Sequence, residues 1–458
     1  MEASRRGVCD TIPGARIRHL YSSWVVIGTY CIRLVILVTI IFVGSSQGRE
    51  LTQAATAASR HERRLEAYTD SRSNGAPMHG PAVQSFRVSD GSWVDCIPIE
   101  QQIAAHHPAL QDHIIRMQES SSTHLNLQQQ NADRQSLLHP QRFAREHGGC
   151  PEGSIPVQRM STDSKQLSLR KQQQYHRRHP RHSKHVGNGS AAAANDLGHL
   201  YAVVGAPETV GAYAGAGAIF SVNGPVIGDP SYEFSLSQLW IAAGNGNNTN
   251  TVEVGWQTYP ALHQGDNPLA PHLFVYWTSD DYHGIGCYNL ECPGFVQTSN
   301  TWVLGGSLAY TTLAEETQNE FNYDDEISIS VVFDSTIPGW SLSINETNVG
   351  YWPSSLYTTL QTSADTLEWG GEIAPSTIPT NTSMGSGAFP SAGFPLAAYQ
   401  RNVIFYDSAL TPMNADLSLL GVTNANCYNV SIQQSGDFAN WGSYFFFGGP
   451  GGLDSACV

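Results

Sequence analysis

The chain has 458 residues, enough for more than one domain, and only 14% of them are charged. Residues 198–458 hold one basic residue, Arg401, against 23 Asp and Glu, a net charge of 1 − 23 = −22, whereas residues 1–197 hold 23 basic residues and 16 acids, a net charge of 23 − 16 = +7. This balance argues against nucleic acid as a partner of the acidic part, because phosphate contacts need Lys and Arg. It suits an acidic compartment, where protonation relieves the repulsion among carboxylates.

The first 46 residues have the pattern of a targeting segment. Basic residues at the N-terminus precede an apolar stretch whose unbroken part, residues 34–43, is ten residues long. That length is short for a membrane span and typical of a signal peptide. We expect a cleaved signal peptide at 1–46, with an uncleaved signal anchor as the alternative. A membrane is therefore a partner only if this segment is not cleaved.

Three segments follow before the acidic part begins. Residues 47–84 show no periodicity and are predicted to be a disordered spacer. Residues 85–160 alternate like a strand near Trp93 and then show a roughly helical pattern interrupted by Pro108, which predicts a small α+β unit. Cys96 and Cys150 are its only cysteines and would pair in an oxidising compartment. Residues 161–197 are rich in His, Arg and Lys and predict an exposed linker open to proteolysis, with metal or heparin binding as the alternative.

From residue 198 onward, short strand patterns alternate with Gly, Pro and Asn turns. Examples are LYAVVGA, AIFSVN, EISISVVF, WSLSI and NVIFYD, and one short helix is expected at 356–367. This pattern predicts an all-β sandwich or barrel. Four cysteines in this part allow three pairings, among which the sequence alone does not choose: Cys287, Cys292, Cys427 and Cys457.

Two carboxylates lie in uncharged, aromatic surroundings. In TVEVGWQTY, side chains alternate between the two faces of a strand, so Glu253 and Gln257 share a face with only Gly255 between them. In WGGEI, Glu372 follows two glycines, where the backbone can approach a ligand closely. Residues 198–458 contain no GxSxG, no HExxH and no phosphate-binding glycine loop. The alternative for each acid is an ordinary surface carboxylate.

Long motifs of this part occur in the order VEVGWQTYP, HLFVYWTSDDYHGIGCYNLECPGFVQ, VGYWPSSLY, LEWGGEIA and MGSGAFPSAGF. In these motifs the chain resembles the neprosin family of secreted plant glutamic peptidases. Upstream, FRVSDGSWVDCIPIEQQIAAHHPALQDH and GGCPEGSIPVQR resemble the propeptide of that family. The resemblance covers about 85–160 and 198–458, and it implies an antiparallel β-sandwich catalytic domain preceded by a small α+β propeptide domain.

The resemblance implies an endopeptidase that cleaves after proline, with Glu253 and Glu372 as its catalytic pair and no cofactor. Two nearby carboxyls do not both ionise easily, so one can deprotonate a water while the other donates a proton, best in acid. Glu368 is the alternative second acid, because it shares a face with Glu372 on an extended strand. Three residues are expected to bind substrate: Gln257, whose amide would donate to the developing oxyanion, Trp277 and Trp369.

The family pattern also favours the disulfides Cys287–Cys292 and Cys427–Cys457. It implies a latent precursor inhibited by its own propeptide, secreted to the cell wall or apoplast or sent to an acidic vacuole. The opposite net charges predict that the propeptide docks on the acidic part at neutral pH. Sequons predict glycosylation at five positions: Asn188, Asn247, Asn345, Asn381 and Asn429.

Two other functions fit part of the pattern. Paired carboxyls also hydrolyse glycosidic bonds, and Trp-rich sandwiches bind sugars by stacking. A carbohydrate-active enzyme or a non-catalytic lectin-like protein is therefore the alternative. No metal is expected, because the four cysteines lack zinc-ligand spacing and His partners. The chain departs from the family where Trp340-Ser341 replaces paired tryptophans, and in the acidic stretch 313–325.

Overall fold

The computed structural model describes residues 79–117, 139–159, 198–207, 211–263, 267–310, 326–433 and 440–452. All of them belong to one compact unit, Tyr68–Val458. The expected signal segment, most of the spacer and the linker 161–197 lie outside the described residues. Among the residues described, no helix is long and apolar enough to cross a membrane, and no cluster of His, Cys, Asp and Glu is placed to hold a metal ion.

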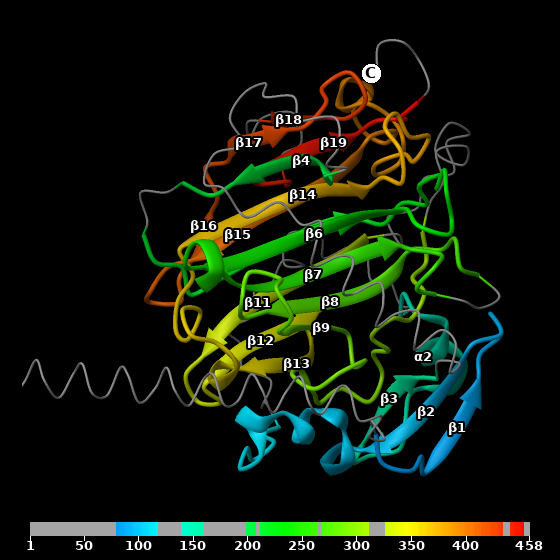
Figure 1. The fold of residues 1–458 in the computed structure, drawn as a ribbon, viewed down its shortest axis with the longest axis vertical. Coiled ribbons are helices and arrows are strands. Elements are labelled where there is room, and N and C mark those ends of the chain that lie inside the picture. Colours follow the sequence, from blue (N-terminus) through cyan, green and yellow to red (C-terminus); the bar gives the residue numbers. More distant parts are fainter. Residues whose placement is uncertain are drawn as a thin grey trace, which may run out of the picture. The chain divides into compact units, whose positions relative to one another are not determined.

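Three antiparallel sheets form the fold, as the sequence predicts for an all-β protein (Figure 1). The smallest has the order β1 (Gln84–Arg87), β2 (Trp93–Pro98) and β3 (Ser154–Gln158). The seven-stranded sheet has the order β17 (Ser418–Val422), β4 (Leu200–Gly205), β14 (Thr366–Ala374), β6 (Phe234–Ala243), β7 (Asn250–Thr258), β8 (His272–Thr278) and β9 (Gly286–Tyr288).

The nine-stranded sheet is the second layer of the sandwich. Its order is β10 (Val296–Gln297), β13 (Thr347–Pro353), β12 (Gly339–Ile344), β11 (Glu326–Asp334), β5 (Gly215–Ser221), β15 (Ala398–Tyr406), β19 (Tyr444–Gly448) and β18 (Asn429–Gln433), with β16 (Pro412–Asn414) paired to β15. Its inner face packs on the seven-stranded sheet, and two hydrogen bonds cross this core. Trp256 donates its indole N–H to Ser221 O at 2.8 Å, and Gln400 Nε2 donates to Ser237 Oγ at 2.9 Å.

The N-terminal segment, residues 79–159, is a small α+β unit held by the disulfide Cys96–Cys150. The helical pattern predicted after Pro98 forms three separate 3-10 turns instead: η1 (Ile99–Gln101), η2 (Ile103–His106) and η3 (Pro108–Leu110). Gln102 and His107 between them are extended, and Pro108 opens the third turn. A proline disfavours helical backbone at the residue before it, which explains the break at His107. The α-helix of this segment is α2 (Arg142–His147).

The short helix expected at 356–367 does not form. A 3-10 turn, η7 (Ser354–Leu356), is followed by a turn and then by β14. The Asn250 side-chain oxygen accepts from the backbone N–H groups of Thr358 and Thr359, at 2.7 and 2.9 Å. A side chain from β7 therefore holds the backbone of residues 358–359 in this turn.

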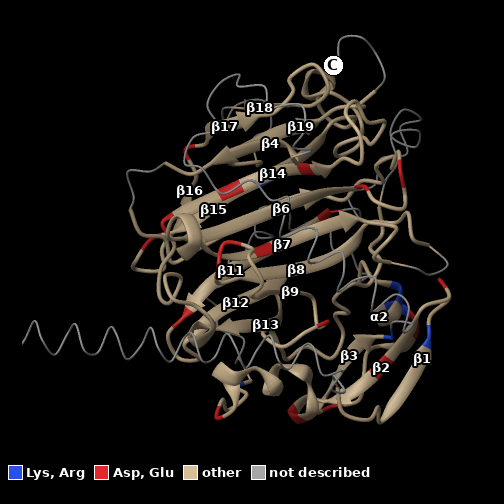
Figure 2. Cartoon of the chain, in the orientation of Figure 1, with Lys and Arg blue, Asp and Glu red and all other residues tan. Residues whose placement is uncertain are grey.

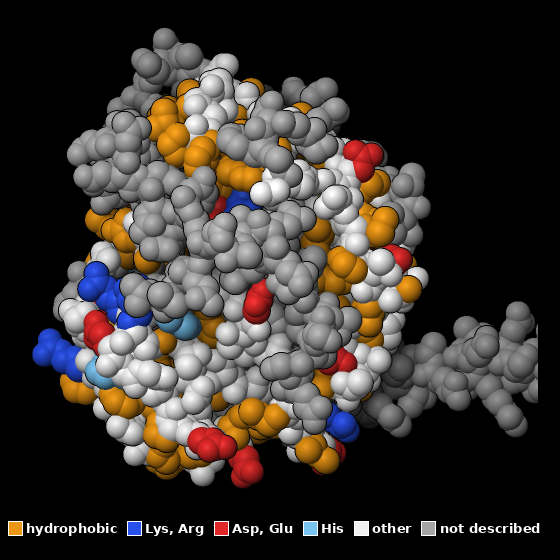
Figure 3. Space-filling model, turned by 180° about the vertical axis from the view of Figure 1, so that it is seen from behind, with side chains coloured by type: hydrophobic (Ala, Val, Ile, Leu, Met, Phe, Trp, Pro, Cys, Tyr) orange, Lys and Arg blue, Asp and Glu red, His pale blue; other side chains and the backbone are white. Residues whose placement is uncertain are grey.

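The distribution of charge follows the sequence (Figure 2). Lys and Arg lie around β1 and α2, and the view from behind shows most basic side chains gathered over the N-terminal segment (Figure 3). Arg401 on β15 is buried and forms a two-pronged ion pair with Glu326, both N–O distances being 2.7 Å. It also lies over the Trp441 ring, 5.6 Å from the ring centre. The single cation of residues 198–458 is thus held in the fold.

The N-terminal segment docks on the sandwich through amide groups. In two of these contacts a side-chain amide donates to a backbone carbonyl and accepts from the backbone N–H of the same residue. In the third, the Asn300 side chain donates to Cys150 O, and the backbone carbonyl of Asn300 accepts from Cys150 N–H. The described pairs are Gln102 with Gln297, Gln141 with Val303, and Asn300 with Cys150. Their N–O distances run from 2.7 to 3.1 Å.

We expected opposite net charges to favour this docking, and this stays a prediction. Among the described residues, Arg159 pairs with Asp95 inside the N-terminal segment, and Arg401 pairs with Glu326 inside the sandwich. The described contacts that cross the interface include amide bonds and ring contacts, such as His139 against Trp302 at 4.1 Å between ring centres. Charged groups take part as well: Asp90 accepts from the Ser307 hydroxyl at 2.9 Å, and Arg116 donates to Thr336 O at 3.4 Å.

Candidate active site

Three cross-strand rows bring the polar residues of β7, β6 and β14 to one face of the seven-stranded sheet. The rows are Glu253–Trp240–Glu368, Gly255–Gln238–Gly370 and Gln257–Leu236–Glu372. Paired residues point to the same side, and successive rows are two residues apart, so all three rows share a face. We call this the carboxyl face. The alternate residues, Trp256 and Trp369 among them, point to the nine-stranded sheet.

Strand geometry sets the spacing of the three acids. Strands lie about 4.8 Å apart and rise about 3.3 Å per residue, so the Cα atoms of Glu253 and Glu368 are separated by about 10 Å, and those of Glu253 and Glu372 by about 16 Å. The middle row carries one side chain, Gln238, between two glycines. A Cβ on Gly255 would lie 2.0 Å from Ser237 O, so only glycine fits this close strand contact. The floor between the two outer rows is therefore nearly bare.

Glu253 is fully buried and receives three hydrogen bonds. The hydroxyls of Tyr282 and Thr251 donate to Oε1 at 2.6 and 2.8 Å, and Gln238 Nε2 donates to Oε2 at 3.2 Å. Donors of this kind favour the ionised form of a carboxyl. The described donors around Glu253 thus favour its ionised form.

Glu372 is also fully buried, but its neighbours differ from those of Glu253. Its Oε1 forms a hydrogen bond with Nδ1 of His199, which immediately precedes β4. The same oxygen accepts a hydrogen bond from the Tyr201 hydroxyl at 3.4 Å. Glu368, four residues earlier, is only partly buried and is paired with Gly205 of β4. Of the two possible partners for Glu253, Glu372 is the one enclosed by protein.

Glu253 and Glu372 both raise the pKa values of two buried tyrosines, Tyr201 and Tyr288. Burial raises the pKa of the Tyr201 phenol well above its usual value, and the charges of Glu372, Glu253 and Glu368 raise it further. Burial likewise raises the pKa of the Tyr288 phenol, with Glu253 and Glu372 adding to the rise. Tyr201 lies on β4 and Tyr288 on β9, at opposite sides of the carboxyl face. Both phenols stay protonated and able to donate.

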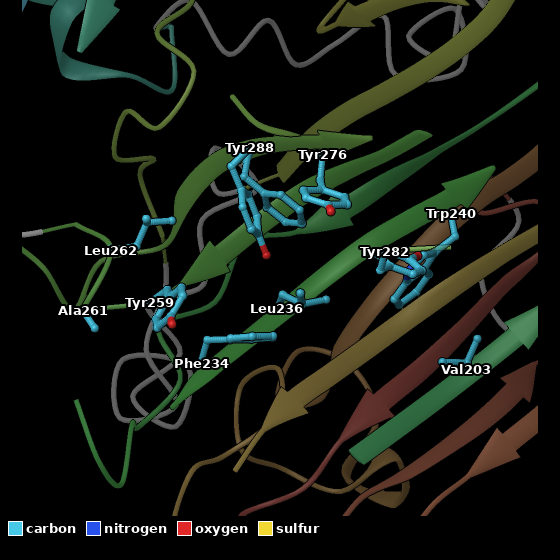
Figure 4. Packing of buried hydrophobic residues seen from close by; sticks show 11 residues of the cluster. Val203, Phe234, Leu236, Trp240, Tyr259, Ala261, Leu262, Tyr276, Tyr282 and Tyr288 are labelled. Carbon is cyan, nitrogen blue, oxygen red and sulfur yellow. The ribbon is translucent and has the colours of Figure 1, made fainter. Parts of the chain in front are cut away.

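Aromatic rings surround the carboxyl face (Figure 4). Tyr276 on β8 is paired with Glu253, and its ring lies 4.8 Å from that of Tyr288 and 5.9 Å from that of Tyr282. Figure 4 shows Tyr282 beside Trp240, the residue between Glu253 and Glu368. We did not predict these tyrosines from the sequence. The alternation in HLFVYWT was the available signal, because it places Phe274 and Tyr276 together on one face of β8.

The residues expected to bind substrate separate into two groups. Gln257 lies on the carboxyl face, fully buried, and its side chain interacts with the Tyr288 hydroxyl. Trp369 and Trp277 lie on the opposite face, because they pair with Leu239 and Val252, which point to the core. A substrate on the carboxyl face would not contact these two tryptophans.

The structure describes part of the expected covalent chemistry. Cys96–Cys150 and Cys287–Cys292 are disulfides, with Cα separations of 5.6 and 5.8 Å. Cys427 is disulfide-bonded, and its expected partner Cys457 lies outside the described residues. Of the sequon asparagines, Asn247 and Asn381 are exposed, Asn345 and Asn429 are partly exposed, and Asn188 lies outside the described residues.

Comparison with family models agrees with this architecture. The model described as Neprosin matches residues 231–450, which contain Glu253, Glu368 and Glu372. The model described as Neprosin activation peptide matches residues 85–205, from the small sheet through β4. The two matches stand in the order expected of a peptidase precursor. The chain therefore belongs to the neprosin family and carries its activation peptide ahead of its neprosin domain.

Proposed function

We propose that the chain is the precursor of a secreted glutamic endopeptidase that works in acid. One observation carries this proposal: two fully buried glutamates lie on one sheet face with different hydrogen-bond partners. A pair of carboxyls in different surroundings is what general acid and general base catalysis needs.

Glu253 is the general base in this mechanism. Its three donors keep it ionised, so it accepts a proton from a water molecule whose oxygen attacks the carbonyl carbon of the scissile bond. Because water is the nucleophile, no covalent bond to the enzyme forms.

Glu372 is the general acid. It first hydrogen-bonds the carbonyl oxygen, and then gives its proton to the leaving nitrogen as the C–N bond breaks. One water is consumed, Glu253 ends protonated and Glu372 ionised, and proton exchange with solvent resets the pair. Two buried donors on this face could bind the oxyanion or the peptide backbone: the Trp240 indole N–H, which makes no hydrogen bond within the described structure, and the Gln257 amide, which lies by the Tyr288 hydroxyl.

The aromatic side chains suggest the substrate preference. Tyr276, Tyr282, Tyr288 and Trp240 present ring surface next to Glu253. The pyrrolidine ring of proline is compact and apolar and packs well on such rings. We therefore propose cleavage on the carboxyl side of proline.

The precursor form is proposed to be latent. Glu253 and Glu372 have no exposed surface in the full chain, so a peptide cannot reach them until part of the structure moves or is removed. Cleavage within the linker 161–197 is the proposed maturation step. Disulfides and sequons support secretion to the cell wall or delivery to an acidic vacuole.

A digest of a peptide library at acid pH, read by mass spectrometry, tests the proposal. We expect cleavage after proline by the acid-treated full-length protein, and no cleavage by the same preparation carrying Glu253→Gln. Cleavage of oligosaccharides with no cleavage of peptides would favour the glycosidase alternative. No structural observation favours a sugar-binding wall of tryptophans, because the seven largest buried side chains are tryptophans with almost no exposed surface.

A further inference from the structure

A histidine stands against the Glu372 carboxyl. His199 and Glu372 are both buried, and Nδ1 of His199 contacts Oε1 of Glu372. The register explains the contact: Tyr201 is paired with Glu372, and His199 lies two residues before Tyr201, on the same face. The His199 ring packs edge-on against Phe234 of β6, with ring centres 5.5 Å apart. Strand pairing and packing thus hold the imidazole in place.

We propose that His199 is a positioning residue that shares one proton with Glu372 and so keeps this carboxyl supplied as the acid of the reaction. The catalytic consequence rests on the proposed function, whereas the sharing of the proton is a property of the pair alone.

Burial is the physical reason for sharing. A lone charge is costly in a buried site, so neither an isolated carboxylate nor an isolated imidazolium is stable there. A pair that holds one proton has no net charge, whether as carboxylic acid with imidazole or as carboxylate with imidazolium. The proton moves between Oε1 and Nδ1 along one hydrogen bond. The pair therefore keeps its proton to higher pH than a carboxyl with neutral donors alone.

The surroundings of His199 are consistent with this role. Its described titratable neighbours are Glu372 from β14 and Tyr201 from β4, with Glu253 and Glu368 further along the same face. From β6 it meets the apolar ring of Phe234. Glu253, in contrast, is held by hydroxyl and amide donors that carry no exchangeable charge in acid. The partners of the two glutamates thus divide the roles of base and acid.

The pH dependence of peptide cleavage tests the catalytic part. In His199→Asn, an amide can still donate to the carboxylate but cannot hold the shared proton. We expect the alkaline limb of the kcat/KM profile to move down by about 1 pH unit or more, with kcat reduced and KM nearly unchanged. Tyr201→Phe is the matched variant: it removes a donor from the same oxygen without removing a proton carrier, so its alkaline limb should not move down. A His199→Asn enzyme that is slower at every pH with an unmoved limb would overturn the proposal.

A second measurement does not need activity. In the full-length chain with ¹⁵N-labelled histidine, NMR follows the titration of His199, assigned by its loss in His199→Asn. Glu372→Gln removes the opposite charge, so the midpoint of the His199 titration should move to lower pH by about 1 unit or more. An unchanged midpoint refutes proton sharing. Full peptidase activity in Glu253→Gln would instead refute the proposed function, leaving the NMR result to decide on the pair.

Discussion

Glu253 and Glu368 lie on one cross-strand row, each paired with Trp240, whereas Glu372 lies two rows further along the same face. Strand register alone would select Glu368 as the partner of Glu253. Burial favours Glu372 instead, and Glu253 and Glu372 both raise the pKa of Tyr288. This relationship turns the choice of the second acid into a question that two isosteric variants can answer.

We expect Glu372→Gln to reduce kcat by roughly 100- to 10,000-fold, the usual effect of losing a general acid or base. Glu368→Gln, on the same strand and the same face, is the matched control and should retain most activity. Steady-state rates at the acid optimum, with circular dichroism to confirm folding, make the comparison. If Glu368→Gln is inactive and Glu372→Gln is active, the acid is Glu368.

Tyr282→Phe should weaken the general base. It removes the 2.6 Å hydrogen bond to Glu253, and a hydrogen bond to a charged group contributes about 1.5–3 kcal/mol. The carboxylate then takes up a proton at higher pH, so the acid limb of the kcat/KM profile should move up and activity at low pH should fall about 10-fold. Tyr357→Phe is the control, because that buried hydroxyl makes no hydrogen bond within the described structure. Equal profiles for the two variants would contradict the role of Tyr282.

Gln141→Ala should loosen the activation peptide. The variant leaves the buried Val303 N–H without its partner, which costs about 1–3 kcal/mol, and removes one of two described donors to the Val303 C=O, the other being the Gly306 N–H. We expect the uncut precursor to mature faster at a given pH, as followed by gel electrophoresis and N-terminal sequencing. Arg142→Ala is a neighbouring control on the exposed side of α2.

Salt separates these amide contacts from charge attraction. Attraction between exposed charges is screened within about 3 Å at 1 M salt. Because the described ion pairs lie within each part and the described interface contacts are hydrogen bonds and ring contacts, maturation of the wild-type precursor should change little between low salt and 1 M salt. A large acceleration by salt would instead show that attraction between the opposite net charges holds the activation peptide.

Acid should release the activation peptide partly through His139. Burial against the sandwich lowers the pKa of His139 from 6.5 to about 4. A group with a lowered pKa binds fewer protons in the docked state, so docking is strongest above pH 6.5 and weakens as the pH falls from there toward 4. His139→Phe keeps a ring against Trp302 without the titration. The pH of half-maximal maturation should then fall by about 0.5 unit.

His106→Gln is the control for that experiment, because His106 is exposed on the same segment. A precursor carrying His139→Phe that matures with the wild-type pH dependence would exclude His139 as a sensor. The stacked pair His263 and His272, which lies under the same docking site, would then be the next pair to vary.

The sequence by itself determined the class of fold and the identity of the acids on the carboxyl face. Alternation of apolar and polar residues specifies strands locally, so the β-sandwich and the shared face of Glu253 and Gln257 were predictable. Spacing along β14 likewise placed Glu368 and Glu372 on one face. Cys96 and Cys150 were paired because no other cysteine lies in their segment.

Only the tertiary structure decided which strands are neighbours. The insertion of β6 between β7 and β14 sets the distances among the three acids, and a non-local register of this kind leaves no trace in local periodicity. The same is true of His199, which meets Glu372 across 173 positions of sequence. Trp277 and Trp369, which we expected at the site, point to the core instead. Side chains alternate between the two faces of a strand, and only the packing of the second sheet shows which face is buried in the core.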